Sequence, residues 1–472
     1  MSTQSTDMSI QYEMSVTGAA DTPQSYEPTS PQTSLAEINN PTPSLTVSAL
    51  KRQAILTIVA AFTLTFTGCG LNFAFGVYQE LYETIGGPFQ DVSPAQIDLI
   101  GTLAVSLMTI GAPFASAWTK SYGPCKVTML GATLFAAGNI LASFGTQLWH
   151  FILAQGVLLG CGTCLTYIPS VTVAPGWFDK RRGLALGIAL SGTGVGGLVW
   201  APTLRACNSY FGFRNTLRLT GGVSFALICT AGFVLKWDPD SQKRNELNSR
   251  GNFKIPLVNW NIAKSRMFVV KATAATVQAA AYYTPIYFFS SYARSLGFSA
   301  IAGANFIALS NGLSAAGKVI LGYAADRYGR LNVLVICTLI SALSILTLWL
   351  PSSLLGGSQN VSALFISFTI LYGITAGVYV SLFPTVLAEI FGVQHFASIN
   401  GFLYMLRGLG TLVGTPVAGA LIRSGTSTTV TKLPSNFTSC ITMAGVLLTV
   451  ASMAVFYVRL EAVKPVGWRW KM

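Results

Sequence analysis

The chain has 472 residues, of which 51 % are apolar or aromatic and only 10 % are charged. A soluble domain uses roughly 25 % charged residues, so these few charges could not cover a water-facing surface. The composition therefore excludes a soluble globular enzyme, a coiled coil, a disordered protein and a disulfide scaffold. The class that remains is a polytopic membrane protein.

The formal net charge is +13, and its placement matters more than its size. The first 50 residues contain five acids and no Lys or Arg, which leaves +18 on the chain from Lys51 onward. This basic excess lies between hydrophobic runs, which argues against nucleic-acid binding. The same 50 residues include 22 Ser, Thr or Pro and show no apolar periodicity. We therefore expect residues 1–53 to form a disordered cytosolic tail.

A membrane-crossing helix needs about 20 predominantly apolar residues, because its backbone polar groups must be satisfied within the helix. Long stretches without ionisable residues, two of them divided by turn-like sequences, predict twelve such helices. A polar segment at 237–266 separates two six-helix bundles, 54–236 and 267–458, and a cytosolic tail follows at 459–472. The expected helices are 54–78, 97–118, 127–145, 149–173, 183–204, 217–236, 267–290, 301–324, 331–351, 363–390, 397–422 and 436–458.

The distribution of basic residues predicts the orientation of this all-α polytopic chain. With the amino terminus in the cytosol, 20 Lys and Arg lie on the cytosolic side and 6 on the other. Since basic residues favour the cytosolic side, we expect both termini to be cytosolic. The two glycosylation sequons, at Asn360 and Asn436, then fall on outside loops. The expected location is the cell membrane, with a vacuolar membrane as the alternative.

A short motif occurs at matching places in the two halves. Residues 322–330 read Gly-Tyr-Ala-Ala-Asp-Arg-Tyr-Gly-Arg, whereas residues 116–124 carry Lys120 and Ser121 where the first copy has Asp and Arg. A glycine lets two helices approach, and an acid at a helix end can pair with Arg or with a facing helix amino terminus. We expect this motif to latch a cytosolic gate through Gly322, Asp326, Arg327, Gly329 and Arg330.

The copy at residues 322–330 resembles the loop signature of the major facilitator superfamily. A second segment, Trp177-Phe-Asp-Lys180-Arg181-Arg182-Gly-Leu-Ala-Leu-Gly-Ile-Ala, resembles the signature of its monocarboxylate porter family, with fungal members most similar. This resemblance covers residues 51 to about 460 and implies two six-helix bundles that work by alternating access. It also places Lys180, Arg181 and Arg182 at the gate.

The chain departs from the animal members of that family at two places. Ser314 and Lys318 stand where those members carry Asp and Arg in the eighth helix, and their acidic Asp-Gly-Gly motif is missing from the first helix. Both departures weaken the inference that the substrate is a simple monocarboxylate moved with a proton.

An ionisable group inside a span is costly and is by default a functional hypothesis. Arg407 lies near the middle of its predicted helix, where it fits either an anion contact or a structural pair. Lys318 lies closer to a helix end, where it fits either a substrate contact or a side chain that extends to the cytosolic surface. Lys271, one turn into its helix, is expected to be an interfacial anchor. No acid occupies a midplane position, so a carboxylate proton relay is unsupported. The predicted substrate contacts are Arg407, Lys318, Asn311, Asn72, Tyr282 and Tyr283.

The fifth predicted helix contains Gly192-x-Gly194-x-Gly196-Gly197. This pattern is similar to the glycine-rich fifth helix of drug–proton antiporters in the wider superfamily. Close helix packing explains the same pattern, because small residues let helices approach each other.

The sequence therefore predicts a secondary transporter that moves a small organic anion or a related metabolite. Efflux of a fungal secondary metabolite or drug is the alternative, and a non-transporting nutrient sensor is a third. No phosphate-binding loop, metal-ligand cluster or nucleophile elbow is found, so we expect no enzyme activity, no cofactor and no metal. The expected partners are a small-molecule substrate and the lipid bilayer, with a monomeric transport unit and no nucleic acid.

Overall fold

The computed structural model describes residues 47–83, 88–89, 92, 94–178, 181–248, 260–355, 360–422 and 433–463. All regular secondary structure in these ranges is helical. Lys180 and the acidic amino-terminal tail up to residue 46 lie outside the described residues.

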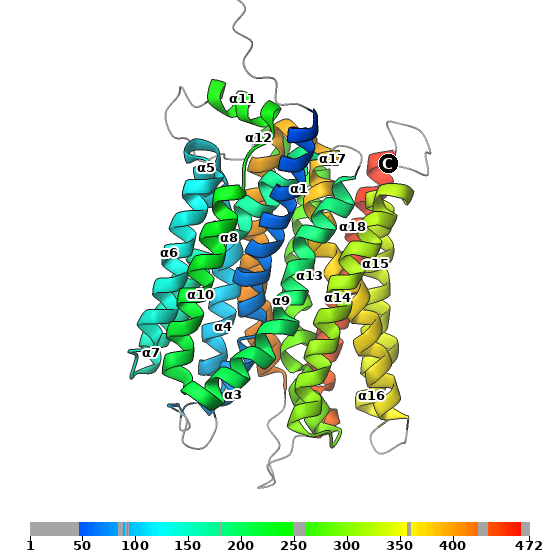
Figure 1. Cartoon of the computed structure of the whole chain (residues 1–472). Helices are drawn as coiled ribbons and strands as arrows, with labels where there is room; N and C mark the ends of the chain where they lie inside the picture. Colours follow the sequence, from blue (N-terminus) through cyan, green and yellow to red (C-terminus); the bar gives the residue numbers. More distant parts are fainter. Residues whose placement is uncertain are drawn as a thin grey trace, which may run out of the picture. The chain divides into compact units, whose positions relative to one another are not determined.

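The amino-terminal half, residues 47–234, forms six helical runs (Figure 1). The first continues from α1 through a π-helical turn into α2 and then α3, and the second bends by 49° between α4 and α5. The fourth joins α7 to α8 through a second π-helical turn. The bounds are α1 Val47–Leu64, α2 Gly70–Phe73, α3 Gly76–Glu83, α4 Pro94–Ile110, α5 Ala112–Tyr122, α6 Pro124–Ala142, α7 Leu148–Phe151, α8 Leu159–Val173, α9 Arg182–Phe211 and α10 Phe213–Val234.

The carboxyl-terminal half, residues 266–463, forms the other six runs. Two short helices, α11 and α12, belong to the segment that connects the halves in sequence. They lie at one end of the bundle, which we call the linker end (Figure 1). At the opposite end lie α3, α7 and α16. The bounds are α11 Pro239–Asn248, α12 Trp260–Ala263, α13 Arg266–Ser295, α14 Ala300–Tyr328, α15 Arg330–Ser344, α16 Leu350–Leu354, α17 Val361–Ala420 and α18 Thr438–Val463.

The helices agree with the twelve predicted spans to within a few residues at most ends, although α9 continues to Phe211 where the predicted span ended at 204. Further differences concern the two tails and the tenth and eleventh spans. Residues 47–53, expected in the disordered tail, belong to α1, and residues 459–463, expected in the terminal tail, belong to α18. The tenth and eleventh spans form one helical run, α17, with a break at Gly392 (φ 77°, ψ 155°). A residue with a side chain would be strained at that positive φ, so this glycine lets the chain turn between two spans without a loop.

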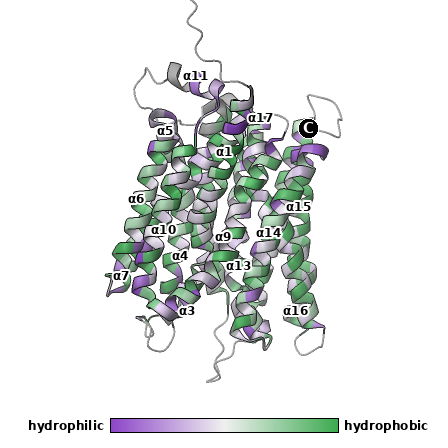
Figure 2. Ribbon diagram, in the orientation of Figure 1, coloured by the Kyte–Doolittle hydropathy of each residue, from purple (hydrophilic) through white to green (hydrophobic). Residues whose placement is uncertain are grey.

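Eight of the described helices are long and apolar enough to cross a membrane, and the bent pair α4–α5 makes a ninth. The three other runs, α13, α14 and the second part of α17, carry Lys271, Lys318 and Arg407. Apolar residues extend along the lengths of the helices and hydrophilic residues gather toward the two ends (Figure 2). The chain is therefore a multi-pass membrane protein, and its helix count is consistent with twelve spans.

Two antiparallel helix pairs join the halves. In the first pair, α9 and α14 meet at Gly183 with Gly322, and a Cβ atom added to Gly183 would lie 2.7 Å from the Gly322 carbonyl oxygen. Further along α9, a Cβ atom added to Gly187 would clash with the Lys318 carbonyl oxygen. One added to Gly194 would clash with the Asn311 carbonyl oxygen. These contacts, four and seven residues apart, fall on one face of each helix, so the glycines of the fifth run form a seam of close packing.

The α9–α14 pair separates toward the opposite end of the bundle. Gly303, near the start of α14, packs against Ser290 of α13 in its own half, whereas α9 continues to Phe211. The second pair joins α4 and α5 to the later part of α17, where Gly401 contacts Pro113 and Gly408 contacts the Ser106 carbonyl. The halves are thus held together most closely from the linker end to the middle of the bundle.

Candidate functional site

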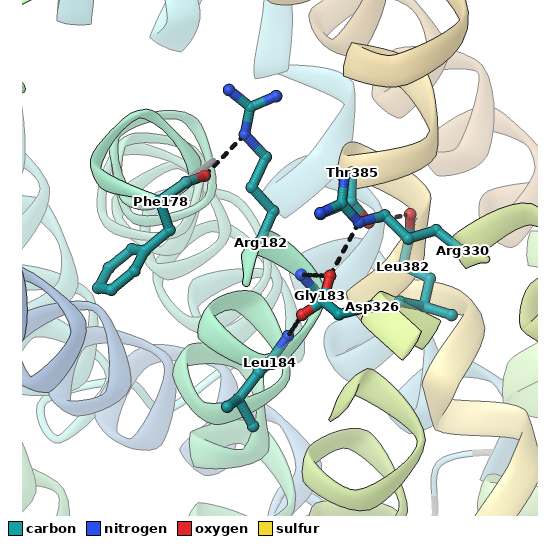
Figure 3. Close-up of polar contacts among 8 residues, drawn as sticks. All are labelled: Phe178, Arg182, Gly183, Leu184, Asp326, Arg330, Leu382 and Thr385. Atoms are coloured by element: carbon teal, nitrogen blue, oxygen red, sulfur yellow. Dashed lines mark hydrogen bonds and ion pairs between the residues drawn. The ribbon is translucent and has the colours of Figure 1, made fainter. Parts of the chain in front are cut away.

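Asp326 connects the two halves at the linker end (Figure 3). Its Oδ1 accepts a hydrogen bond from the Gly183 backbone N–H at 2.9 Å, and its Oδ2 accepts one from the Leu184 N–H at 2.8 Å. Those N–H groups belong to the first turn of α9, where a helix has no acceptor of its own and carries a partial positive charge. Arg330 Nε also donates to Asp326 Oδ1 at 2.9 Å, with both side chains about one-tenth exposed.

The other predicted gate residues lie around this contact. Arg182 donates from Nε to the Phe178 carbonyl at 2.8 Å, which ties the start of α9 to the residues before it (Figure 3). Arg181 and Arg327 are exposed at the same end. Gly329 has φ of 100° and forms the tight turn between α14 and α15, which orients Arg330 back toward Asp326.

Lys318 lies inside the seam between α9 and α14. It is buried, and its Nζ donates to Thr193 Oγ1 at 2.5 Å and to the Leu190 carbonyl at 3.3 Å. Both acceptors belong to α9, so the ammonium group forms a second polar connection between the halves, one that a change of conformation along this seam would have to break.

Arg407 lies in a separate cluster between α13 and α17. It is 5 % exposed, and its Nη1 donates to Gln278 Oε1 at 3.0 Å. Its guanidinium carbon is 5.1 Å from the ring centres of both Tyr379 and Phe383 and 5.9 Å from that of Tyr404. The aromatic faces partly compensate the buried charge. Among the described residues, no carboxylate forms an ion pair with it.

Lys271 belongs to the same cluster, and the prediction that it is an interfacial anchor is wrong. Its side chain is fully buried, with Nζ 5.8 Å from the Tyr379 ring centre and 5.4 Å from that of Phe383. Nζ has no hydrogen-bond partner among the described residues. The position near a helix end suggested a surface role, but α17 packs against this part of α13 and its aromatic rings cover the side chain.

The cluster reaches the amino-terminal half through a tyrosine pair. The hydroxyl of Tyr404 on α17 lies 3.2 Å from that of Tyr167 on α8, and both are buried. Sequence reasoning missed Lys271, Gln278, Tyr379 and Phe383 as site residues. A usable signal is present for two of them, since Lys271 and Gln278 are seven residues apart and therefore share one face of an α-helix.

The remaining predicted substrate contacts do not all meet at one place. Tyr282 and Tyr283 are buried on α13, about one turn after Gln278, which binds Arg407. Tyr283 also stacks on Phe73 of the amino-terminal half, with ring centres 6.0 Å apart. The structure thus brings these tyrosines to the Arg407 cluster.

Asn311 and Asn72 lie elsewhere. Asn311 is on the α9–α14 seam beside Gly197, with its Nδ2 unpartnered among the described residues. Asn72 donates to Thr163 Oγ1 at 3.3 Å and lines a small cavity inside the amino-terminal half. Neither shares the cluster that surrounds Arg407.

Both predicted glycosylation sequons lie at the end opposite the linker. Asn360 is exposed at the start of α17, and Asn436 is partly exposed in the short 3-10 turn that precedes α18. The structure therefore places both asparagines at the same end of the bundle.

The fold and the site together define a class of protein. Two halves of membrane-length helices meet along glycine seams, with polar contacts between them at one end and buried cations between their helices. This arrangement is that of a membrane transporter whose halves can move against each other.

Comparison with known proteins identifies the family. The sequence model of the Major Facilitator Superfamily matches residues 55–317 and 306–468, so the chain belongs to that superfamily. The "MFS-type transporter pynF" of Aspergillus niger is 26 % identical over 91 % of this chain and 94 % of its own length. The "Agnestins efflux protein AgnL12" of Paecilomyces divaricatus is 24 % identical, covering 87 % and 88 %.

An animal relative and a solved structure agree with this assignment. Human "Monocarboxylate transporter 11" is 28 % identical over 77 % of this chain and 75 % of its own length. The crystal structure of the human organic anion transporter MFSD10 (TETRAN) has the same fold, with a TM-score of 0.60 at 14 % identity, covering 86 % of this chain and 99 % of that one. The predicted fold and family are confirmed, and the relatives are transporters rather than enzymes.

Proposed function

We propose that this protein is a secondary transporter that moves a small organic anion by alternating access. The observation that carries the proposal is Arg407, a nearly buried guanidinium without a carboxylate partner among the described residues. A buried charge that lacks a counter-charge is expensive, so its retention inside a membrane protein favours a functional role. An anionic substrate supplies the missing charge when it binds.

The neighbours of Arg407 support this assignment. Gln278 accepts one of the five guanidinium N–H groups, which fixes the orientation of the side chain and leaves other donors for a ligand. The rings of Tyr379, Phe383 and Tyr404 provide an apolar surface next to the charge. An organic anion has both parts, a charged group and a carbon skeleton, whereas an inorganic ion has only the first.

The proposed cycle assigns different roles to the polar contacts between the halves. Asp326 and Lys318 hold α9 against α14 while the linker end is closed, and substrate exchange at that end needs both contacts to break. Tyr282 and Tyr283 line the path beside Arg407. In this scheme Lys318 acts on the conformational change more than on the substrate, because its ammonium already has two acceptors on α9.

The proposed orientation puts the linker end and both termini in the cytosol, as the basic residues favour. The proposed location is the plasma membrane, and a single chain is the proposed transport unit. The sequons at Asn360 and Asn436 then face outward, where glycosylation takes place.

The experiment that tests the function is anion flux into proteoliposomes containing the full-length protein. Arg407→Ala is expected to reduce flux at least about 30-fold, because truncating one partner of a buried, hydrogen-bonded charge costs roughly 2–5 kcal/mol. Arg52→Ala is the matched control, since Arg52 is exposed on α1. Undiminished flux in an Arg407→Ala protein that is correctly folded would remove Arg407 from the site.

A second candidate is export of a larger aromatic metabolite. It is favoured by the number of aromatic rings around Arg407 and by the efflux protein among the relatives. The direction of transport separates it from uptake. Cells that lack the protein would accumulate the compound under export and would fail to take up the anion under import.

A further inference from the structure

Lys271 and Arg407 lie against the same two aromatic rings. Their charged groups are 5.1–5.8 Å from the ring centres of Tyr379 and Phe383, which are stacked on successive turns of α17 with centres 5.6 Å apart. Lys271 comes from α13, and Arg407 comes from the later part of α17. Three helical segments therefore converge on one place that holds two basic side chains.

Most N–H groups of Lys271 and Arg407 have no hydrogen-bond acceptor among the described residues. Lys271 Nζ has three donors and no acceptor among the described residues. Arg407 donates to Gln278 Oε1. Cation–π contacts lower the cost of burying the charges, but they satisfy no N–H group. Fully buried donors without acceptors are rare in proteins and call for an explanation.

We propose that Lys271 and Arg407 form a single binding site for an organic dianion. One anionic group binds the ammonium of Lys271 and the other binds the guanidinium of Arg407, while the carbon skeleton lies along Tyr379 and Phe383. This inference rests on the proposed transport of organic anions and names the charge of the substrate.

The number of buried charges favours a dianion over a monocarboxylate. A single carboxylate can neutralise one of the two cations and leaves the other with no counter-charge in apolar surroundings. Two anionic groups on one skeleton compensate both. The planar arms of a guanidinium suit a carboxylate, which accepts two parallel hydrogen bonds, and the ammonium donates hydrogen bonds to the second anionic group without a fixed geometry.

The test compares dianions with monoanions of matched skeleton on the purified full-length protein. Succinate is paired with butyrate and phthalate with benzoate, and binding is measured by ligand-induced thermal stabilisation and by counterflow in proteoliposomes. The wild-type protein is expected to bind at least one dianion about tenfold more tightly than its monoanion, which corresponds to one additional charge-assisted contact.

Lys271→Met removes the ammonium and keeps the length of the side chain. It is expected to weaken dianion binding about tenfold and to change monoanion binding less than about threefold, whereas a purely structural lysine would weaken both equally. Lys271→Arg keeps a positive charge at this position and should therefore retain the preference for dianions over monoanions. Arg266→Met, at an exposed position on the same helix, is the control.

The possible results separate this inference from the proposed function. Monoanions that bind through Arg407, with no advantage for dianions, would overturn the two-cation site and leave anion transport standing. Binding of uncharged metabolites only would overturn both. If Lys271→Met fails to fold, the preference of the wild-type protein and the Lys271→Arg variant still decide the question.

Discussion

The contact between Asp326 and α9 gives the sharpest prediction for the conformational change. In Asp326→Asn the carboxylate charge and one of its two acceptor oxygens are lost, so at most one of the N–H groups of Gly183 and Leu184 keeps its partner. A hydrogen bond to a charged group contributes roughly 1.5–3 kcal/mol. Since an amide oxygen remains, we expect the closed linker end to lose about 2 kcal/mol, or about 30-fold in its equilibrium with the open form.

Hydrogen–deuterium exchange measures this change at the bonds concerned. The Ala185 N–H donates to the Arg181 carbonyl at 3.0 Å. Among the residues that the structure describes, the amides of Gly183 and Leu184 have Asp326 as their acceptor. Their exchange is therefore expected to rise by at least the 30-fold estimated for opening. Asp240→Asn, at an exposed position on α11 at the same end, should leave it unchanged.

Exchange at residues 183 and 184 that is as slow in Asp326→Asn as in the wild-type protein would refute this reasoning. It would mean that other contacts hold the linker end closed. Faster exchange with unaltered transport would instead show that this contact does not limit the cycle.

Two further predictions concern helix packing and orientation. Gly187→Leu should destabilise the protein by roughly 1–3 kcal/mol and lower its unfolding temperature, because the new side chain would meet the Lys318 carbonyl. Gly222→Leu, where nothing lies within 4 Å, should leave that temperature close to the wild-type value. Changing both Asn360→Gln and Asn436→Gln should abolish a glycosidase-sensitive shift in electrophoretic mobility. A wild-type protein from a eukaryotic host that carries no glycan at Asn360 or Asn436 would argue against the proposed orientation.

Much of the fold follows from the sequence alone. A span must satisfy its backbone within one helix and face lipid, so uninterrupted apolar stretches mark its position to within a few residues. The predicted start at 183 and the observed start at Arg182 agree for this reason. Helix ends that extend beyond the apolar stretch are harder to predict, since polar residues end the hydropathy signal before the helix ends. The extension of α1 back to Val47 is an example.

The sequence also identified residues whose chemistry is local. Asp326 and Gly322 lie in a motif of fixed spacing, and the helix that they meet begins at a second motif. The charge of Arg407 could be recognised as unusual from its place within an apolar run, because an ionised group has few reasons to be there.

Only the tertiary structure decided which of these groups share a site. Lys271 and Arg407 are 136 positions apart, and Lys318 is nearer to Arg407 in the sequence than Lys271 is. The partners of these three side chains depend on which neighbouring helix each side chain faces in the packed bundle. Hydropathy contains no information on that orientation. Packing pairs Lys318 with Thr193 on α9 and places Lys271 beside Arg407. The sequence determined which charges lie within the membrane, and the packing of glycine seams and aromatic rings decided what each charge faces.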